Sequence, residues 1–481
     1  MMIRTAIVFF ALSCMSAASA SLSAEVEIAA NTTTGNGNFI IQLNKNLCIN
    51  NFVPEFIDHA YQVAAQATGE NLVKRANKIV LHGTEEEHVH VFDTYNIGND
   101  YKAIGVRFKD SNVMKTLLEK LGDQVVGIAA DQDIKFNLPT IRSRASKKRL
   151  TRRAQAERKG NLNIESLGKG CAKVDNTISV IKGTEESNST ALISQPGAEW
   201  GLVRISQHTP VDYNSSYVYP ASGGSTAFVY IVDDGLRTDH VDFGGRATFG
   251  FNAYSDNDLV GTGHGTHVAG IVGGSTYGVA KNVTMIGVKV LDNAGSGQIS
   301  GILSGLQWIS NNAANQKGKA IVNMSLGLPV ENPNDPVYDS FNKAVSSLVD
   351  SGIPVITAAG NENITTCNFL PAGNPSTFAV GATTKDDQMA SFSNFGNCTD
   401  INAPGQDIKS TYSYNSTATE ILSGTSMAAP HVAGVAALFV DILGNPTPAA
   451  LYDAISNSST KDAIKSIKIG TPNLLVYNRP L

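Results

Sequence analysis

The sequence predicts an α/β protein: a parallel sheet with helices on both faces, preceded by a small α+β domain. Strand-like and helix-like segments alternate through residues 37–138, and continuous apolar strands alternate with helix-length segments through residues 193–481. A polar and strongly basic stretch, residues 139–192, separates the two parts. A chain of 481 residues is also long for one compact domain, so at least two are expected.

Residues 1–20 have the pattern of a secretory signal peptide. Arg4 precedes a short apolar run over residues 6–12, and small residues follow over residues 18–20. A charge, an apolar run and an A-x-A-like cleavage site are typical of such a signal. No later stretch reaches about 18 uninterrupted apolar residues, the length that a membrane span needs. We therefore expect an exported protein with no membrane span, destined for the extracellular space, with a vacuolar or lysosome-like compartment as the alternative.

The first predicted domain covers residues 37–138. Its expected strands are residues 38–43, 88–92, 103–108 and 125–129, and its expected helices are residues 55–67 and 112–121. The order strand, helix, strand, strand, helix, strand is that of a ferredoxin-like α+β domain.

Residues 139–192 form the predicted linker. Its first part is dense in positive charge and poor in large apolar groups, which favours a solvated segment without a packed core. Two dibasic pairs, Lys148-Arg149 and Arg152-Arg153, also make the linker a candidate site of proteolytic processing.

The net charge of −5 is unevenly distributed along the chain. From Gln195 to Leu481 there are 14 Lys and Arg residues against 22 Asp and Glu, a balance of −8, whereas the preceding part has a balance of +3. An acidic C-terminal part lacks the basic footprint of a nucleic-acid-binding domain, so no nucleic-acid partner is expected.

The second predicted domain covers residues 193–481. Its apolar strands are expected at residues 228–232, 284–290, 320–324, 354–358 and 377–382, and its helices at residues 264–274, 299–311, 339–351 and 426–443. Continuous apolar strands that alternate with helices indicate a parallel sheet buried on both faces. The active sites of such sheets lie beyond the carboxyl ends of the strands.

Four polar residues lie at these strand ends and helix starts. Asp233 ends one apolar strand, and His264 opens a helix. Asn361 follows a buried strand, and Ser426 opens the last long helix. Any one of them alone is usually a helix cap. Together, in the order Asp, His, Asn, Ser, they match one of the convergent arrangements of serine proteases.

The chemistry of peptide hydrolysis gives each of the four residues an expected role. A serine hydroxyl is a poor nucleophile until a base takes its proton, which is the role expected of His264 toward Ser426. Asp233 is expected to orient the imidazole and to stabilise its charged form. The side-chain amide of Asn361 and the backbone N–H of Ser426 are the expected donors of an oxyanion hole, at the positive end of a helix.

From Gln195 onward the sequence resembles the catalytic domain of subtilisin-like serine proteases, and most of all their proteinase K branch. The matching stretches include residues 200–206, 263–267, 277–281, 287–292, 295–297, 391–396, 424–434 and 472–475. Residues 37–138 resemble, more loosely, the inhibitory propeptide of the family. The resemblance implies a secreted serine endopeptidase that is made as a zymogen and hydrolyses peptide bonds through an acyl-enzyme on Ser426.

The resemblance also implies the partners of the protein. The substrates would be polypeptides, the propeptide would be an intramolecular inhibitor and folding template, and the enzyme would be a monomer without a catalytic cofactor. Two alternatives are open for the N-terminus of the mature enzyme: autocleavage near residues 190–195, or trimming at Arg149 or Arg153.

The residues that would bind substrate also follow from the resemblance. They are Gly295, Ser296, Gly297, Ser325, Leu326, Gly327, Ala358, Ala359 and Gly360. The first two triplets would pair with an extended substrate as an added strand, which reads backbone rather than side chains. The third triplet would form the small-residue wall of the primary pocket. No acid matches the pocket positions of the family's dibasic-specific members, so broad cleavage after apolar or aromatic residues is expected.

Two stabilising features are implied by the resemblance. Cys367 and Cys398 match a disulfide of some bacterial members of the branch. A structural calcium ion would be bound by Asp400 and by the main-chain carbonyls of Pro375 and Thr377, an oxygen-only ligand set that suits Ca²⁺.

Export permits disulfides and glycans elsewhere in the chain. Sequons for N-glycosylation include those at Asn188, Asn214, Asn282, Asn363 and Asn415, although so short a pattern also arises by chance. The other two cysteines beyond the signal, Cys48 and Cys171, have no evident partner in the sequence.

Asp234 departs from the pattern of the family. Its members have Asp-Thr-Gly or Asp-Ser-Gly where this chain has Asp233-Asp234-Gly235. The residue two positions before the glycine matches the catalytic aspartate, which assigns Asp233. Adjacent strand residues point to opposite faces, so Asp234 is not expected to reach the same imidazole. Whether it is a tolerated turn residue or a charge that raises the pKa of Asp233 or His264 stays open.

Two other classes of function fit less of the sequence. A non-catalytic binding protein that keeps its propeptide would have no use for an intact set of four catalytic residues. A surface adhesin would account for the sequons, but the sequence contains nothing repetitive or lectin-like.

Overall fold

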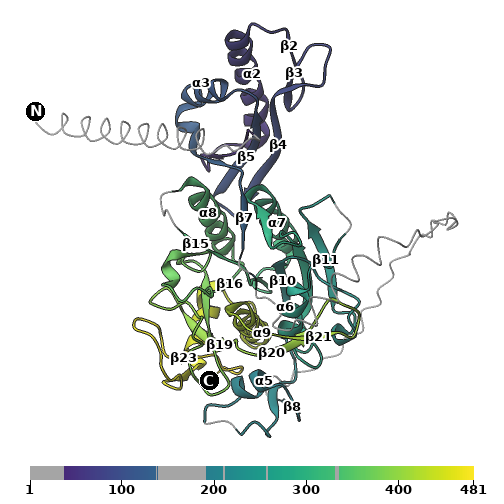
Figure 1. Cartoon of the computed structure of the whole chain (residues 1–481), viewed down its shortest axis with the longest axis vertical. Coiled ribbons are helices and arrows are strands. Elements are labelled where there is room, and N and C mark those ends of the chain that lie inside the picture. Colours follow the sequence, from purple (N-terminus) through teal and green to yellow (C-terminus); the bar gives the residue numbers. More distant parts are fainter. Residues whose placement is uncertain are drawn as a thin grey trace, which may run out of the picture.

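The computed structural model describes residues 37–136, 138, 191–209, 212–255, 258–330 and 335–480. The predicted signal peptide and all but the last two residues of the predicted linker lie outside the described residues. The described residues form an N-terminal α+β region and a larger region built on a mostly parallel sheet, one above the other in Figure 1. The predicted fold class is confirmed in both regions.

The N-terminal region has the predicted ferredoxin-like order of elements. These are β1 (Asn38–Leu43), α2 (Ile49–Thr68), β4 (Glu87–Ile97), β5 (Tyr101–Phe108), α3 (Ser111–Leu121) and β6 (Val125–Ala130). The sheet order is β2-β3-β4-β5-β1-β6, and β1 runs antiparallel to both β5 and β6. The edge hairpin of β2 (Leu72–Lys74) and β3 (Lys78–Leu81) was not predicted from the sequence pattern.

Helix α2 begins earlier than predicted. The expected start was Glu55, one residue after Pro54, and proline is unfavourable inside a helix. In the structure the helix starts at Ile49, and Pro54 is its sixth residue. Phe52, two residues before the proline, is buried in the core between the helices and the sheet. Burial of that aromatic side chain offsets the hydrogen bond that the proline removes.

The larger region contains a nine-stranded sheet in the order β11-β12-β10-β14-β16-β18-β19-β23-β22. Neighbouring strands are parallel from β11 to β23, and only the edge pair β22–β23 is antiparallel. The five predicted strands are β10 (Phe228–Asp233), β12 (Thr284–Lys289), β14 (Ala320–Met324), β16 (Val355–Ala358) and β18 (Phe378–Thr383). The four that were not predicted are β11 (Ala247–Asn252), β19 (Ile401–Pro404), β22 (Thr460–Lys461) and β23 (Leu474–Leu475).

Side chains of the central strand β10 alternate between two hydrophobic cores. Val229 and Ile231 belong to the core on one face of the sheet, and Tyr230 and Val232 belong to the core on the other face. Both faces are therefore covered, as a parallel sheet requires. The first face carries α5 (Trp200–Ile205), α6 (His264–Gly273), α9 (Thr425–Leu443) and α10 (Pro448–Ser458), and the second carries α7 (Ile299–Asn312) and α8 (Pro336–Asp350).

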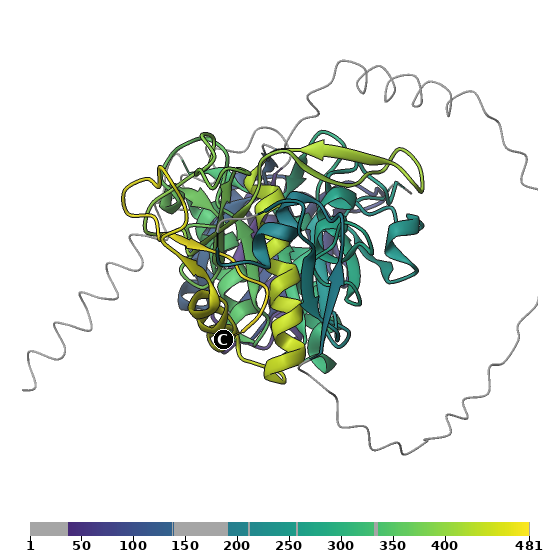
Figure 2. The ribbon, with the colours of Figure 1, turned by 90° about the horizontal axis from the view of Figure 1, so that it is seen from below.

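Helix α9 runs through the middle of the larger region (Figure 2). Within the described part of the chain it is the one helix long and apolar enough to cross a membrane. However, 83% of its apolar window is buried inside the protein. Its apolar character is thus explained by its place in the core.

Four short strand pairs lie outside the two sheets. They are β7 (Asp133–Lys135) with β13 (Ser296–Gln298), β8 (Leu192–Gln195) with β9 (Tyr217–Pro220), β15 (Leu328–Pro329) with β17 (Phe369–Leu370), and β20 (Ile408–Thr411) with β21 (Thr419–Leu422). The first pair joins the two regions, because β7 follows the N-terminal sheet and β13 belongs to the larger region.

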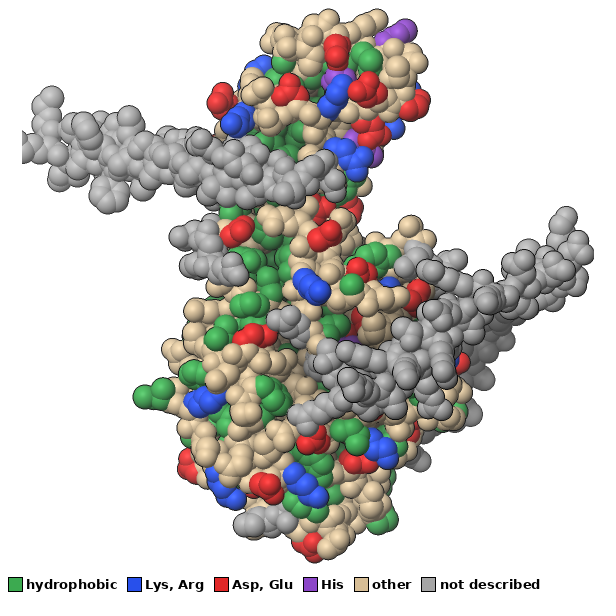
Figure 3. Space-filling view, in the orientation of Figure 1, with side chains coloured by type: hydrophobic (Ala, Val, Ile, Leu, Met, Phe, Trp, Pro, Cys, Tyr) green, Lys and Arg blue, Asp and Glu red, His purple; other side chains and the backbone are tan. Residues whose placement is uncertain are grey.

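The N-terminal region rests on α7 and α8, and hydrophobic side chains gather at the narrow junction in Figure 3. The hydroxyl of Ser347 in α8 accepts hydrogen bonds from the backbone N–H of Asp100 at 2.9 Å and of Tyr101 at 3.1 Å. The carboxylate of Asp131 accepts one from the backbone N–H of Ser300, in the first turn of α7, at 2.9 Å. The two regions therefore share a core and a set of polar contacts.

Candidate active site

The predicted catalytic residues converge at one edge of the parallel sheet. Strands β10, β14 and β16 are neighbours in the sheet, so their carboxyl ends lie side by side. Asp233 is the last residue of β10, and Asn361 follows the end of β16. His264 is the first residue of α6, and Ser426 is the second residue of α9. The first turns of two helices on the same face thus meet these strand ends.

Asp233 and His264 form a buried hydrogen-bonded pair. Nδ1 of His264 lies 2.8 Å from Oδ1 and 3.0 Å from Oδ2 of Asp233. A carboxylate only accepts hydrogen bonds, so Nδ1 carries the proton and Nε2 of the neutral ring is left as an acceptor. That Nε2 is buried and has no hydrogen-bond partner among the described residues. The pair is therefore arranged to receive a proton at Nε2.

The surroundings of the pair raise both pKa values. Burial raises the pKa of Asp233 to about 6, although the charge of His264 and its hydrogen bond oppose the rise. Burial alone would lower the pKa of His264. The charge of Asp233, the hydrogen bond to it and the charge of Asp234 outweigh burial, so the pKa of His264 is raised.

Ser426 is held by Ser325 rather than by the histidine. Its Oγ donates to the carbonyl oxygen of Ser325 at 3.0 Å, and Oγ of Ser325 donates to the carbonyl oxygen of Ser426 at 3.0 Å. The link between Ser426 and Nε2 of His264 is therefore not formed in this structure. Hydrogen bonds of catalytic groups are often loose in substrate-free enzymes and tighten with substrate.

Asn361 is oriented by the residue before the serine. Its Oδ1 accepts from the backbone N–H of Thr425 at 2.8 Å and from the hydroxyl of Thr425 at 3.0 Å. Because Oδ1 is engaged, the Nδ2 group is the part of the amide left to serve as a donor. The backbone N–H of Ser426 is a second donor, since the first N–H groups of a helix have no acceptor within the helix.

Asp234 does not contact the imidazole, as the alternation of strand side chains predicts. Its carboxylate instead accepts hydrogen bonds from the backbone N–H of Thr262 at 2.8 Å, from the hydroxyl of Thr262, and from the backbone N–H of Gly265 at 2.9 Å. These partners flank His264 in the sequence.

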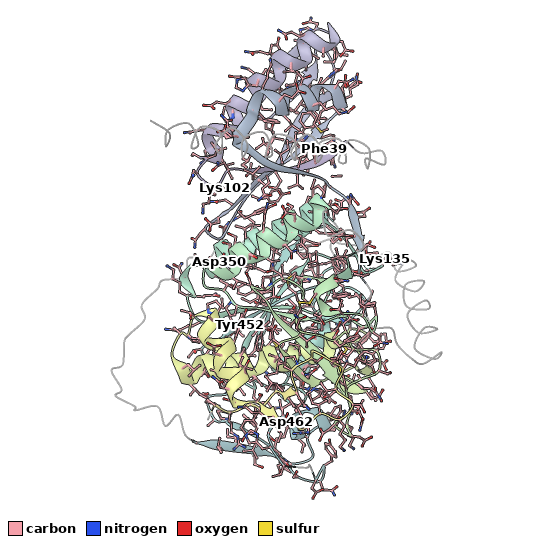
Figure 4. The ribbon with its side chains drawn as sticks, turned by 90° about the vertical axis from the view of Figure 1, so that its left-hand side faces the viewer. Phe39, Lys102, Lys135, Asp350, Tyr452 and Asp462 are labelled. Atoms are coloured by element: carbon pink, nitrogen blue, oxygen red, sulfur yellow. A yellow bond between two sulfur atoms is a disulfide. The ribbon has the colours of Figure 1, made fainter. Side chains whose placement is uncertain are left out.

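The first predicted substrate-binding triplet, residues 295–297, is occupied by the chain's own N-terminal region. In the pairing of β13 with β7, Ser296 is opposite Lys135 and Gly297 is opposite Ile134. Lys135 lies at the level where the two regions meet in Figure 4. The backbone N–H of Phe136 continues the ladder and donates to the carbonyl oxygen of Gly295 at 2.8 Å.

The other two predicted triplets follow the ends of neighbouring strands. Residues 325–327 come directly after β14, and residues 358–360 begin at the last residue of β16. Gly360 has a φ of +105°, and a Cβ there would lie 2.1 Å from Nδ2 of Asn394. Only glycine fits that place.

Sequence reasoning missed the residues that support Asn361. The carboxylate of Glu362 accepts from the backbone N–H of Asn361 at 2.7 Å. The side chain of Asn394 donates to Glu362 at 3.2 Å and accepts from the backbone N–H groups of Glu362 and Ile364. Asn394 is 33 positions beyond Asn361 in the sequence. The one signal was its place in a stretch, residues 391–396, that carries the resemblance to the family.

Two histidines near the site are bonded to backbone. Nε2 of His267, in the next turn of α6, lies 3.1 Å from the carbonyl oxygens of both Ile408 and Glu420, and burial lowers its pKa to about 3. Nδ1 of His431 lies 2.8 Å from the carbonyl oxygen of Met427, and burial lowers its pKa to about 4. Both rings are thus neutral groups whose hydrogen bonds to backbone carbonyls give them a structural role.

The structure contains the expected disulfide between Cys367 and Cys398. Cys48 is a free, exposed cysteine, and Cys171 lies outside the described residues.

Asp400 is a largely buried carboxylate beside β18. Its Oδ2 accepts from the backbone N–H of Ala379 at 2.7 Å, and burial raises its pKa to about 6. Across the described residues no cluster of three or more His, Cys, Asp or Glu side chains suited to a metal is found. A cation at Asp400 would therefore take its remaining ligands from main-chain carbonyls.

Comparisons with known proteins agree with this geometry. The profile of the Subtilase family matches residues 224–471. Alkaline protease 1 of Aspergillus clavatus is 44% identical over 290 residues, 60% of this chain and 69% of that protein. Proteinase T of Parengyodontium album is 44% identical over 293 residues, 60% of this chain and 95% of that protein.

A solved structure leads to the same family. The crystal structure of a cold adapted subtilisin-like serine proteinase is 41% identical to this chain and matches it with a TM-score of 0.54. The match covers 59% of this chain and 99% of the other. The chain therefore belongs to the subtilase family and is a subtilisin-like serine endopeptidase of the proteinase K branch, an enzyme that acts on polypeptides without a catalytic cofactor.

Proposed function

We propose that this chain is the zymogen of an exported endopeptidase in which Asp233, His264 and Ser426 form the catalytic triad. The supporting observation is the buried pair of Asp233 and His264, with an unpaired Nε2, at the strand ends where α9 presents Ser426. Export is supported by the signal-like pattern of residues 1–20 and by the disulfide Cys367–Cys398.

The first half of the reaction forms an acyl-enzyme. Oγ of Ser426 leaves the carbonyl oxygen of Ser325, gives its proton to Nε2 of His264 and attacks the carbonyl carbon of the scissile bond. The carbonyl oxygen becomes an oxyanion, which Nδ2 of Asn361 and the backbone N–H of Ser426 stabilise. The intermediate collapses, the C–N bond breaks, and the leaving amine takes the proton from His264.

The second half of the reaction releases the acyl group. Water gives a proton to Nε2 of His264 and attacks the ester carbon, with the same two donors stabilising the oxyanion. The bond to Oγ of Ser426 then breaks, and Oγ takes the proton back. Asp233 keeps the imidazole oriented through Nδ1 in both halves and stabilises its charge.

The zymogen proposal is supported by the pairing of β7 with β13. A substrate bound by β-augmentation would need this same edge of residues 295–297, so the N-terminal region and a substrate compete for it. The side chains of Ile134 and Phe136 are buried in the core that the two regions share. We propose that residues 37–138 are an inhibitory propeptide, as the family resemblance implies.

The direction of β7 points the chain toward the catalytic residues. Because β7 is antiparallel to β13, the chain advances from opposite Gln298 toward Gly295 as it reaches Phe136. The residues before Gly295 lead back to Val290, whose N–H donates to the carbonyl oxygen of Asp233 at 3.0 Å. The carboxyl end of β7 thus points toward the strand end that carries Asp233.

We propose a broad preference for apolar or aromatic P1 residues. Ala358, Ala359 and Leu326 are buried and apolar, as the walls of an apolar primary pocket would be. The nearest acid in the sequence, Glu362, already accepts from the backbone N–H of Asn361 and from the side chain of Asn394.

Structural calcium at Asp400 is proposed on the chemistry of that site. A largely buried carboxylate whose pKa is raised by burial is stabilised by a nearby cation. Ca²⁺ prefers oxygen ligands, and the carbonyls of Pro375 and Thr377 would supply them. The ion would stabilise the contact between β18 and the loop that carries Asp400. It would not take part in the reaction.

Expression of the full precursor beside Ser426→Ala tests the proposed function. The wild type is expected to process itself and to be labelled by a serine-directed phosphonyl reagent, and Ser426→Ala is expected to do neither. Ser423→Ala is the matched control, because its hydroxyl bonds Asp407 rather than the catalytic residues. A wild type that is neither processed nor labelled would contradict the catalytic assignment.

A further inference from the structure

We propose that Asp234 is a positioning residue of the catalytic centre: its buried carboxylate caps the first turn of α6 and holds His264 beside Asp233. The inference rests on the proposed function, because it gives Asp234 a role relative to the proposed base. It concerns the position at which this sequence departs from the Asp-Thr-Gly or Asp-Ser-Gly pattern of the family.

The start of α6 needs a cap from elsewhere in the chain. The cap position is Gly263, which has no side chain, and the first N–H groups of a helix have no acceptor within it. One oxygen of Asp234 accepts from the N–H of Gly265, and the other accepts from the N–H and hydroxyl of Thr262. The carboxylate therefore holds the residues on both sides of His264.

Asp234 is also bonded to the other member of the catalytic pair. Its backbone N–H donates to Oδ1 of Asp233 at 2.8 Å, and its carbonyl oxygen accepts from the ammonium of Lys289 at 2.5 Å. Lys289 is itself buried and also donates to the carbonyl oxygen of Leu291 at 2.9 Å. One residue thus fixes the aspartate through its backbone and the histidine's helix through its side chain.

The start of α6 packs tightly against the end of β10. A Cβ at Gly265 would lie 2.2 Å from the carbonyl oxygen of Gly235 and 2.9 Å from Cβ of Asp233. The helix start is therefore in direct contact with the end of β10. The Asp234 carboxylate holds the helix start in this contact. Its loss would therefore change the distance between Nδ1 of His264 and the carboxylate of Asp233.

The charge of Asp234 adds an electrostatic effect to the geometric one. The positive end of a helix disfavours a charged imidazole at its first residue, and an ionised carboxylate there opposes that effect. All three partners of Asp234 are donors, which suits an ionised carboxylate. The pKa of His264 agrees with this. Burial is the largest influence and lowers it, the charge and hydrogen bond of Asp233 raise it, and the charge of Asp234 raises it further.

Other charged and titratable groups also surround the first turn of α6. They are Asp233 from β10, Lys289 from β12, Asp258 and Arg237 from loops, His267 from α6, and Tyr412 and Glu420 near β20 and β21. Burial lowers the pKa of His267 to about 3, hydrogen bonds lower that of Asp258 despite its burial, and burial raises that of Tyr412 well above its usual range. Among the groups around the first turn of α6, the acidic limb of the free enzyme is therefore assigned to His264, whose pKa is raised by the charge and hydrogen bond of Asp233 despite burial.

The decisive experiment compares Asp234→Asn with Asp242→Asn in the matured enzyme. Asp242 is a matched control: its buried carboxylate accepts from the backbone N–H groups of Thr276 and Tyr277, beyond the opposite end of α6. Asp234→Asn is expected to lower kcat about tenfold with little change in KM, from the loss of a charged hydrogen bond. It is also expected to move the acidic limb of kcat/KM to lower pH by about half a unit.

A second measurement serves if Asp234→Asn fails to mature. In the Ser426→Ala precursor, which is not expected to cleave itself, the titration of the His264 imidazole is followed by NMR with and without Asp234→Asn. The double variant is expected to titrate about half a pH unit lower than Ser426→Ala alone. Asp242→Asn in the same background is expected to leave the titration unchanged.

The outcomes separate this inference from the proposed function. If the wild type is active and phosphonylated but Asp234→Asn keeps the wild-type acidic limb, the inference fails and the triad stands. Equal shifts in Asp234→Asn and Asp242→Asn would show a general loss of stability and would also overturn it. A wild type without activity or labelling would instead refute the proposed function.

Discussion

His264 lies between two buried carboxylates that act on different parts of it. Asp233 bonds the imidazole ring, and Asp234 bonds the backbone on both sides of the residue. The division arises where β10 ends: Asp233 is its last residue, and Asp234 is the first residue of the bend that follows. Two adjacent aspartates thus place one charge against the ring and another against the helix start.

The raised pKa of His264 predicts that the protease loses activity in acidic solution. The base accepts a proton only when it is neutral, so activity is lost as the pH falls through the pKa of the free enzyme. Because the Asp233 charge and hydrogen bond outweigh burial and raise this pKa above 6.5, half-maximal kcat/KM is expected above pH 6.5. A kcat/KM profile from pH 5 to 10 on a chromogenic peptide measures it. A midpoint below 6.5 would contradict the electrostatic account.

Replacement of Asn361 by alanine is predicted to slow the chemical step without weakening substrate binding. Removal of one oxyanion-hole donor typically costs about 3–4 kcal/mol, so kcat is expected to fall about 10²–10³-fold while KM stays nearly constant. Steady-state kinetics of the matured variant give both constants. Asn363→Ala, an exposed neighbour, is the control and is expected to keep the wild-type kcat.

At the scale of residues, local sequence patterns predicted which residues form each motif. They did not predict which hydrogen bonds hold those residues in place. Asp233, His264, Asn361 and Ser426 were recognisable because each lies directly at a strand end or a helix start. The partners of Asp234 and of Glu362, the residue that bonds Asn361, were not, because Thr262, Gly265 and Asn394 are about 30 residues away along the chain. Hydrogen bonds of that separation depend on how the elements pack.

Among the elements, the short strand β7 has the largest consequence for function. It has three residues, and its pairing with β13 closes the edge that a substrate would use. Ile134 faces the shared core with 7% of its surface exposed, and its neighbour Lys135 is exposed. Substitutions of Ile134 and Lys135 can therefore be compared, since the two side chains lie on opposite faces of the same strand.

Ile134→Asp is predicted to weaken inhibition by the N-terminal region. The change removes a buried aliphatic side chain, worth about 1.5–3 kcal/mol, and places a charge in an apolar core. The lag between expression of the precursor and the appearance of protease activity is expected to shorten at least about tenfold.

The lag is followed with a fluorogenic peptide in parallel with a gel of the processed fragments. Lys135→Asp, on the exposed face of the same strand, is expected to keep the wild-type lag. If Ile134→Asp also keeps it, β7 is not an inhibitory contact and the zymogen proposal loses its support.

The loop between Cys367 and Cys398 is predicted to depend on its disulfide. The two cysteines are 31 positions apart in the sequence, and the chain-entropy estimate for a loop of that length is about 4 kcal/mol. The double variant Cys367→Ala and Cys398→Ala is therefore expected to unfold at a lower temperature by several degrees. Calorimetry of the phosphonylated enzyme, which prevents autolysis, measures the shift. A reductant is the control, because it should lower the melting temperature of the wild type and leave that of the double variant unchanged.

At the scale of elements, hydrophobic patterns predicted the strands that are buried on both faces. β10, β12, β14, β16 and β18 read as continuous apolar runs because helices cover both sides of them. β22 and β23 have two residues each, too few to show any periodicity. β11 was missed because most of its side chains are only half-buried, so its pattern lacks a continuous apolar run.

In the whole molecule, stability is predicted to depend on calcium and on pH together. Burial raises the pKa of Asp400 to about 6 from an ordinary value of 3.8, so folding favours the protonated form of that group. The stability that the proton provides is present at low pH and is lost as the pH rises through about 6. Above that pH a bound cation is expected to replace it.

Removal of calcium with a chelator is therefore predicted to lower the melting temperature more at pH 8 than at pH 5. Thermal unfolding of the phosphonylated enzyme at both pH values, with calcium or with chelator, gives the comparison. Asp400→Asn is expected to abolish the chelator effect, and Asp453→Asn, on the surface, is expected to retain it. A chelator effect that is equal at the two pH values would argue against Asp400 as a ligand.

Local sequence patterns alone were enough to predict the fold class, the family and the order of the proposed catalytic residues. These features are local: the apolar runs, the residues at their ends and the motif stretches are each contained in a few neighbouring positions. Tertiary structure alone decided what Asp234 does, which chain segment occupies residues 295–297, and which groups orient Asn361. Each of these is a contact between segments far apart in the sequence, and its energy depends on burial and distance, which only the packed chain defines.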